Sequence, residues 1–262
     1  MDTLPRWRQR DELPLTAENL RALFDNEIPV VRVKGFVSLA DCQSFLRGME
    51  GANVQRFNVP PHPGYIGTAQ FLFRWGHQKA DYFAAARQAY DDRDYVFRRS
   101  WDPIARVNDA LAAATGRPVK VAEEPGFGPY YAGIIRLASG GIKRHTDFAP
   151  FNAPDYTIAS IDAQLGWNLF FETPEGGGST TIYNRPWKAE VVPGQEPPQS
   201  YDLPDSQVAG AETWTYHVAA GDLIFFNTRN PHEVSPGTGA GQRLHIGAFV
   251  GRRPDSSMVV WS

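Results

Sequence analysis

The sequence predicts a mainly β protein with flanking helices, and three observations predict it. From about residue 119 onward, short apolar stretches alternate with Gly, Ser and Pro clusters, a pattern typical of a sandwich or barrel of the jelly-roll or cupin type. The first third instead has apolar residues at helical spacing. Glycine (24) and proline (21) are frequent, and aromatic residues make up 13% of the chain, which indicates many turns and a pocketed protein.

The N-terminal third predicts helices around one short strand. Thr16 and Ser38 each precede an apolar run, and each is expected to cap a helix. Residues 79–91 and 101–115 have the spacing of two further helices. The apolar segment 28–33 is expected to be a strand.

The rest of the chain predicts strands, near residues 130–137, 142–147, 158–163, 165–172, 179–184, 214–218, 222–227, 232–235 and 242–250. The Pro-rich stretch 193–210 is a long loop, and loops of that length are usually lids, binding loops or mobile segments. We expect a single domain over 1–262, with a helical or mixed N-terminal layer at 1–118, a β core at 119–250 and a tail at 251–262.

Composition excludes several classes of protein. The chain is 42% hydrophobic and 21% charged, as globular proteins are, and its net charge of −3 disfavours nucleic acid as a partner. The one cysteine, Cys42, excludes a disulfide framework and favours a reducing, cytoplasmic compartment. The first residues lack the apolar segment of a signal peptide, and no apolar run reaches the roughly 18 residues of a membrane span, so no membrane partner is expected.

A His-x-Asp pattern carries the clearest chemistry. On a strand, His145 and Asp147 point to the same face because side chains alternate. The best third ligand is His232, just beyond the strand at 222–227. Two histidines and one carboxylate, with coordination positions left open, form the facial triad of non-haem Fe(II) oxygenases. The alternative is that His145 and Asp147 pair with each other or with Arg144.

Arg243 is the fourth candidate residue. It lies eleven residues beyond His232, on a strand that is apolar on both faces and is therefore expected to be buried. A buried arginine needs an anionic partner, and its planar fork fits a carboxylate. If Arg243 faces the barrel with His232, it is placed for the distal carboxylate of 2-oxoglutarate, whose 2-oxo acid end would chelate the iron.

The order of these motifs resembles the Fe(II)/2-oxoglutarate-dependent dioxygenase superfamily: His-x-Asp, a distal His after a Gly-Asp-x-x-x-Phe strand, then Arg. The resemblance covers roughly residues 120–250 and implies a double-stranded β-helix (jelly-roll/cupin-like) core beneath the helical N-terminal layer. Size and that layer are most similar to the small-molecule branch, which contains free amino-acid hydroxylases and carrier-independent halogenases. Those halogenases replace the carboxylate ligand with Gly or Ala, so Asp147 argues for oxygen transfer here.

The resemblance implies an enzyme that uses Fe(II), 2-oxoglutarate and O₂ and releases succinate and CO₂. It would oxidise an unactivated C–H bond of a small molecule, with hydroxylation of a free amino acid or derivative as the first expectation. Desaturation or ring closure needs only a different fate for the same radical. A macromolecule-directed oxygenase and a cupin-like metal-binding protein without oxygenase activity stay open as alternatives, and so does a homodimer.

Further site residues are expected around this centre. Besides Arg243, the candidates for binding 2-oxoglutarate are Asn168, Tyr131, Thr180 and His245. His245 departs from the Arg-x-Ser pattern of many relatives, and Asn168 is a polar residue in an apolar strand, where it should have a partner. The candidates for contacting the substrate are Arg74, Trp214 and Phe148; Arg74 is flanked by aromatic residues and can clamp a carboxylate.

Overall fold

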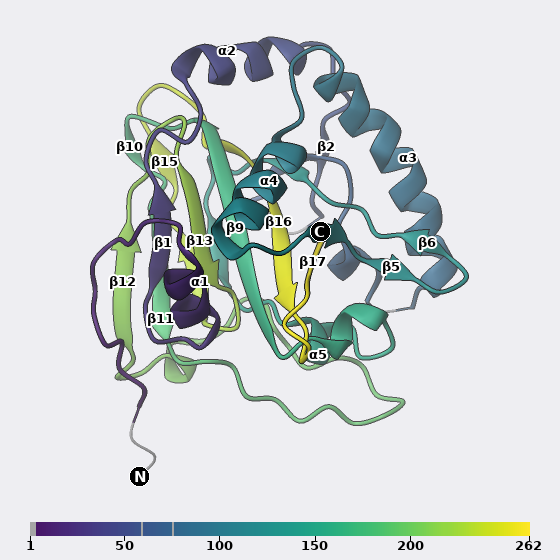
Figure 1. Cartoon of the computed structure of the whole chain (residues 1–262), viewed down its shortest axis with the longest axis vertical. Helices are drawn as coiled ribbons and strands as arrows, with labels where there is room; N and C mark the ends of the chain where they lie inside the picture. The colour runs from purple at the N-terminus through teal and green to yellow at the C-terminus, as the bar shows by residue number, and fades with distance from the viewer. Residues whose placement is uncertain (1–3, 59, 75) are drawn as a thin grey trace.

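Two β-sheets form the centre of the computed structural model, which describes residues 4–58, 60–74 and 76–262 (Figure 1). The larger sheet has the strand order β1 (Val30–Val33), β13 (Leu223–Asn227), β9 (Ala163–Glu172), β16 (Leu244–Arg252), β7 (Ile134–Leu137), β3 (Gly64–Ile66) and β2 (Gln55–Arg56). The smaller sheet has the order β12 (Glu212–Tyr216), β11 (Thr180–Asn184), β14 (His232–Val234) and β8 (Ile142–His145). Neighbouring strands along both orders run antiparallel.

The remaining strands extend or flank these sheets. β17 (Met258–Trp261) pairs with β16 and, in parallel, with β4 (Val119–Val121). Two short antiparallel pairs lie outside both sheets: the long-range pair β10 (Gly176–Gly177) with β15 (Gly237–Thr238), and the hairpin of β5 (Glu123–Glu124) with β6 (Gly128–Pro129). Segments from both ends of the described chain, β1 and β17, are thus hydrogen-bonded into the larger sheet.

The larger sheet presents two different faces because side chains alternate along its strands. On β9, Trp167 and Leu169 point toward the helices, whereas Asn168 points toward the smaller sheet. On β16, Ile246 packs on the helical side and His245 lies on the other. One face therefore builds the hydrophobic core, and the opposite face lines a cavity between the sheets.

The helices are α1 (Ala17–Phe24), α2 (Leu39–Gly48), α3 (Lys79–Phe97), α4 (Pro103–Thr115) and α5 (Ala149–Asn152), with 3₁₀ turns η1 (Gln70–Phe73), η2 (Thr157–Ser160) and η3 (Asp205–Gln207). The expected caps are present: the Thr16 side chain accepts from the Asn19 amide, and Ser38 forms a capping box with Asp41. The helix expected at 79–91 runs on to Phe97, since no Gly or Pro interrupts it.

Helices α1, α2 and α4 pack over the outward face of the larger sheet (Figure 1). The contact is aromatic at its centre, where the ring of Phe45 on α2 stacks on Phe171 of β9 with centroids 3.8 Å apart. Cys42, also on α2, is buried and has a free thiol. This layer holds the larger sheet rigid behind the cavity. None of the described helices is long and apolar enough to cross a membrane.

Two stretches differ from expectation. The strand expected at 158–163 is the 3₁₀ turn η2, because Thr157 and Ser160 bond locally: Thr157 N–H donates to Glu124 and the Ser160 hydroxyl to the Thr157 carbonyl. The tail expected at 251–262 contains β17, whose residues Met258–Trp261 are buried. This short apolar segment therefore adds a strand to the larger sheet.

Candidate active site

Three side chains with metal-binding atoms meet between β8 and β14. His145 on β8 lies directly opposite His232 on β14 in the antiparallel ladder, and Asp147 follows two residues after His145. The Asp147 Oδ2 atom is 3.7 Å from His145 Nε2 and 3.8 Å from His232 Nε2. One ligand atom from each residue lies within 4.8 Å of the others, close enough to share one metal ion.

Backbone carbonyls fix the orientation of both imidazoles. His145 Nδ1 is 2.7 Å from the Lys143 carbonyl oxygen, and His232 Nδ1 is 2.9 Å from that of Asn230. Because a carbonyl can only accept, each Nδ1 carries the proton and each Nε2 keeps its lone pair for the metal. Burial, with the neighbouring His145, lowers the pKa of His232 well below its usual value, which keeps the ring neutral as a ligand must be.

The carboxylate ligand is held through its backbone. The Asp147 amide donates to the Thr228 carbonyl at 2.9 Å, and the Thr228 hydroxyl donates back to the Asp147 carbonyl at 2.9 Å. Two neutral imidazoles and one carboxylate on one side of a point leave the other side open. This donor set fits a divalent iron ion with coordination sites free for further ligands.

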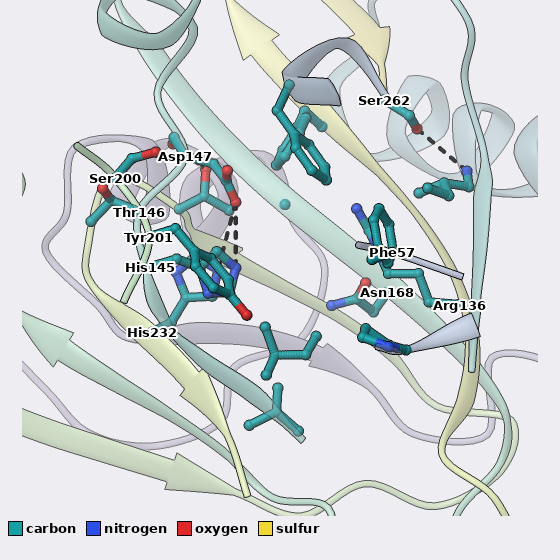
Figure 2. Close-up of a pocket in the computed structure, with 18 of the residues that line it drawn as sticks. Phe57, Arg136, His145, Thr146, Asp147, Asn168, Ser200, Tyr201, His232 and Ser262 are labelled. Atoms are coloured by element: carbon teal, nitrogen blue, oxygen red, sulfur yellow. Dashed lines mark hydrogen bonds and ion pairs between the residues drawn. The ribbon is translucent and has the colours of Figure 1, made fainter. Parts of the chain in front are cut away.

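The three ligands lie at the wall of a cavity of about 720 Å³ between the sheets. Its size is within the range of small-molecule sites and leaves room for a cosubstrate and a substrate together. Much of the lining is apolar, from Phe57, Phe71, Leu72, Ile134, Ile142, Phe226, Val234, Ala248 and Phe249. Figure 2 shows His145, Asp147 and His232 on one side of this cavity, with Asn168 and Arg136 across from them.

Arg243 is buried at the cavity wall and has only neutral partners among the described residues. Its Nε donates to the Gly178 carbonyl at 3.0 Å, its Nη2 to the Thr180 hydroxyl at 3.1 Å, and its Nη1 lies 3.3 Å from His245 Nδ1. The guanidinium also lies over the Phe170 ring. Burial lowers the pKa of Arg243 to about 10, so it is charged at neutral pH and needs an anion.

The structure brings together some of the other predicted residues and not the rest. Asn168, Thr180, His245 and Arg74 line the cavity with the triad and Arg243. Arg74 donates to Asn152 Oδ1 at 3.1 Å, to the Ser200 hydroxyl at 2.6 Å and, through Nε, to the Phe71 carbonyl at 3.1 Å. These bonds fix its guanidinium at the wall.

Tyr131, Trp214 and Phe148 lie outside the cavity lining. Tyr131 is buried and its hydroxyl donates to the Gly133 carbonyl. Trp214 packs against the apolar cluster around Trp7, Ile182 and Phe226, which lies between the two sheets beside the cavity. Phe148 follows Asp147 directly, but its ring packs against Phe151 and beneath Arg229.

Sequence reasoning missed Arg136 and did not name the individual cavity residues around Ser200, although it expected a lid, binding loop or mobile segment at 193–210. Arg136 on β7 lines the cavity and is the register partner of His245 on β16. A charged residue in the apolar run Ile134–Leu137 is a signal that could have identified it. Gln199 and Tyr201, which flank Ser200, also line the cavity, and they belong to the long loop expected at 193–210.

This loop segment runs along the open edge of β8. Thr146 N–H donates to the Ser200 carbonyl at 2.8 Å, and Leu203 N–H donates to the Arg144 carbonyl at 3.0 Å. His145 and Tyr201 form an isolated antiparallel bridge between these bonds. The segment therefore adds a short strand-like stretch beside the metal ligand and closes one side of the cavity.

Comparison with known proteins agrees with this geometry. The family model described as "Carrier-protein-independent halogenase WelO5" matches residues 10–262. An L-gamma-glutamyl-L-propargylglycine hydroxylase of Streptantibioticus cattleyicolor is 29% identical over 263 residues, covering 94% of this chain and 93% of the relative. The leucinostatins biosynthesis cluster protein S of Purpureocillium lilacinum is 29% identical over 216 residues, covering 78% of this chain and 87% of the relative.

A solved structure shares the fold. The N-substituted L-amino acid dioxygenase of Burkholderia ambifaria AMMD superposes with a TM-score of 0.63 at 14% identity, covering 94% of this chain and 91% of that one. The same enzyme is also known in complex with alpha-KG, at a TM-score of 0.62. The expected fold, mainly β with a jelly-roll core and flanking helices, is thereby confirmed.

Proposed function

The chain belongs to the carrier-protein-independent halogenase WelO5 family, and from that premise and its own cavity we propose that it oxidises an unactivated C–H bond of a small molecule. It is an Fe(II)/2-oxoglutarate-dependent oxygenase. The observation that carries the proposal is the convergence of His145, Asp147 and His232 in a cavity whose wall also carries Arg243, a buried arginine with only neutral partners among the described residues. Bound Fe(II) and 2-oxoglutarate supply the oxidant from O₂, with succinate and CO₂ as coproducts.

Asp147 favours hydroxylation over halogenation. Family halogenases have Gly or Ala at the carboxylate ligand, which leaves a coordination position for chloride. Here the Asp147 carboxylate fills that position and lies within 3.8 Å of both imidazole Nε2 atoms. A halide would have to displace an anionic ligand whose backbone is fixed on both sides by Thr228.

Arg243, Thr180 and His245 form the proposed 2-oxoglutarate end of the cavity. Arg243 presents a guanidinium whose fork fits the distal carboxylate, and Thr180 orients that fork through its hydroxyl. Arginine has no acceptor, so Arg243 donates to His245 Nδ1 and the His245 proton is on Nε2. None of the described residues accepts from that Nε2–H, which leaves it as a second donor for the cosubstrate.

An amino acid or amino-acid derivative is the proposed substrate, with Arg74 among its contacts. The hydroxylase relative from Streptantibioticus cattleyicolor acts, by its name, on a γ-glutamyl amino acid. The apolar wall fits an aliphatic or aromatic side chain, and Arg74 lies at the rim close enough to Asp147 for their charges to interact. The single, buried Cys42 supports a reducing, cytoplasmic setting.

The first test is an anaerobic titration of the metal-free protein with Fe(II) and then 2-oxoglutarate. We expect the weak visible charge-transfer band of the chelated pair to appear and saturate at one equivalent. Fe(II) binding without the band would overturn the 2-oxoglutarate assignment. Absence of Fe(II) binding would overturn the metal site and leave a cupin-like protein of another function.

A further inference from the structure

Arg136 is a cavity cation that the proposed cosubstrate site does not use. It lies on β7, opposite His245 of β16 on one side and Tyr65 of β3 on the other. It forms no hydrogen bond or ion pair with any residue in the described part of the chain. Burial lowers the pKa of Arg136 to about 10, while the Asp147 charge opposes that shift, so the guanidinium is cationic at neutral pH. Arg136 is partly buried, and a cation at a cavity wall with no ion-pair partner among the described residues suits a ligand that supplies the anion.

Arg136 and Arg243 occupy two different positions at the wall. Arg243 is tied to the smaller sheet through Gly178 and Thr180. Arg136 is the register partner of His245 on the neighbouring strand β7. It lies beside Asn168, across the cavity from the proposed metal ligands (Figure 2). The charge of Arg136 lowers the pKa of Arg243, as two like charges do. The distal carboxylate of 2-oxoglutarate neutralises only Arg243. A second carboxylate would be needed to neutralise Arg136.

The cavity offers almost nothing to a cationic group. Among the described side chains that line it, Asp147 has the one carboxylate, and it is a proposed metal ligand. The buried Glu124 is outside the cavity lining, is paired with Lys79 and is also bonded to Tyr130. The charges of Fe(II) and the 2-oxoglutarate dianion cancel, so the guanidinium groups leave the loaded cavity positive. An ammonium group would enter against this charge and without a counter-ion.

Neutral amide groups are available instead. Asn58, Asn168 and Gln199 all line the cavity, and each side chain has both a donor and an acceptor. Such groups complement a peptide-like amide, which also has one N–H and one C=O. The lining therefore matches an acid with an amide and an apolar side chain better than it matches a zwitterion.

We propose that Arg136 binds the carboxylate of the primary substrate, and that this substrate is an amino acid whose amine is acylated. The inference rests on the proposed function and narrows its substrate class. Arg136 and the amide-bearing side chains would hold the two ends of the amino-acid backbone. The apolar wall would then contact the side chain that presents its C–H bond to the metal.

The test uses full-length protein loaded anaerobically with Fe(II) and 2-oxoglutarate. The probes are N-acetyl-L-leucine, N-acetyl-L-leucinamide and L-leucine, followed by the same three forms of phenylalanine and methionine. Binding is followed by calorimetry and by the change in the visible charge-transfer band. The variants are Arg136→Gln, Arg136→Lys as the charge-retaining version, and Arg87→Gln as an exposed control on α3.

We expect the wild-type protein to bind at least one N-acetyl acid about tenfold or more tightly than its amide and than its free amino acid. Arg136→Gln should abolish the preference for acid over amide, and Arg136→Lys should retain part of it. The charge-transfer band and 2-oxoglutarate affinity should stay unchanged in all variants. Arg87→Gln should behave as wild type.

Three results would overturn the inference while leaving the proposed function intact. Free amino acids could bind more tightly than the acylated ones, or none of the acylated acids could bind. Arg136→Gln could keep the preference for acid over amide. Arg136→Gln could instead weaken 2-oxoglutarate binding, which would assign Arg136 to the cosubstrate. By contrast, failure of the band in the wild-type protein would overturn the proposed function itself.

Discussion

Arg243 donates to Nδ1 of His245, its neighbour but one on the same edge of the cavity, at 3.3 Å. This contact settles which nitrogen of His245 is protonated, because a guanidinium cannot accept. The neutral His245 ring therefore accepts from Arg243 through Nδ1 and offers its Nε2–H to the cavity as a donor. The Arg243–His245 pair is therefore the feature of the proposed cosubstrate site that most needs testing.

Arg243→Met should separate stability from ligand binding. The change removes a buried charge with only neutral partners, so the melting temperature without 2-oxoglutarate should stay equal or rise. The affinity for 2-oxoglutarate should fall by about 100-fold, within the roughly 2–5 kcal/mol range for truncating one partner of a buried charge pair. Calorimetry and thermal melts with and without 2-oxoglutarate measure both effects.

Arg252→Met is the matched control for that variant. Arg252 pairs with Asp25 and Asp162 away from the cavity, so its loss should leave 2-oxoglutarate affinity unchanged and lower stability slightly. Undiminished 2-oxoglutarate binding by Arg243→Met would remove Arg243 from the site.

His245→Gln should change the pH dependence of stability. Burial, together with the charges of Arg243 and Arg136, lowers the pKa of His245 well below its ordinary value in the folded state. Below about pH 6.5 the unfolded chain then binds a proton that the folded chain does not, so wild-type stability falls on acidification. Glutamine does not titrate, and the slope below pH 6.5 should flatten by about 1.4 kcal/mol per pH unit.

Chemical denaturation of the metal-free protein at pH 5.5, 6.5 and 7.5 measures that slope. Between pH 7 and 8 the wild-type and His245→Gln proteins should show parallel stability curves, because neither histidine nor glutamine carries charge there. Equal slopes below pH 6.5 would mean that His245 is protonated in the folded protein.

Asp147→Ala should weaken Fe(II) binding and abolish coupled hydroxylation. The substitution removes one of the three ligand atoms and its negative charge, and we expect activity to fall by about 100-fold or more. Asp109→Ala, an exposed change on α4, should have no effect. Fe(II) affinity measured under nitrogen checks the site directly, and equal affinity in wild type and Asp147→Ala would disprove the ligand assignment.

Leu203→Pro should loosen the segment beside β8. Proline has no N–H, so the bond from Leu203 to the Arg144 carbonyl is lost. We expect KM for substrate to rise several-fold and succinate to form with less hydroxylated product. Leu203→Ala removes the same buried side chain but keeps the N–H, and it should retain tighter coupling than the proline variant. Equal coupling in the two variants would show that this backbone bond has no role.

The order of motifs in the sequence predicted that His145, Asp147, His232 and Arg243 come together, and the structure places all four at one cavity. Asp147 lies two residues beyond His145, the last residue of β8, and Arg243 directly precedes β16 and lines the cavity together with His245. The caps at Thr16 and Ser38 likewise depend only on nearby residues. Such local signals do not depend on how distant parts of the chain fold.

Two of the predicted site residues lie outside the cavity lining for identifiable reasons. The resemblance implies that Tyr131, on the strand expected at 130–137, faces the cosubstrate, but β7 begins at Ile134 and Gly133 has φ +97°, which interrupts the alternation. Trp214 has inward parity, but β12 is the outer strand of its sheet, so the ring joins the cluster around Trp7. The sequence marks Arg136 as a charged residue in an apolar strand, but only the three-dimensional structure shows that it lines the cavity and has no ion-pair partner among the described residues.

The pairing of residues 200–203 with β8 also protects the chain from self-association. β8 ends the smaller sheet, and an unpaired outer strand offers its N–H and C=O groups to any other strand it meets. The bonds through Ser200 and Leu203 occupy that edge. Any movement that opens this wall to exchange substrate for product must therefore also expose the unpaired backbone groups of β8. Brief, small openings are favoured over wide ones for this reason. Variants that loosen the segment should precipitate more readily during turnover.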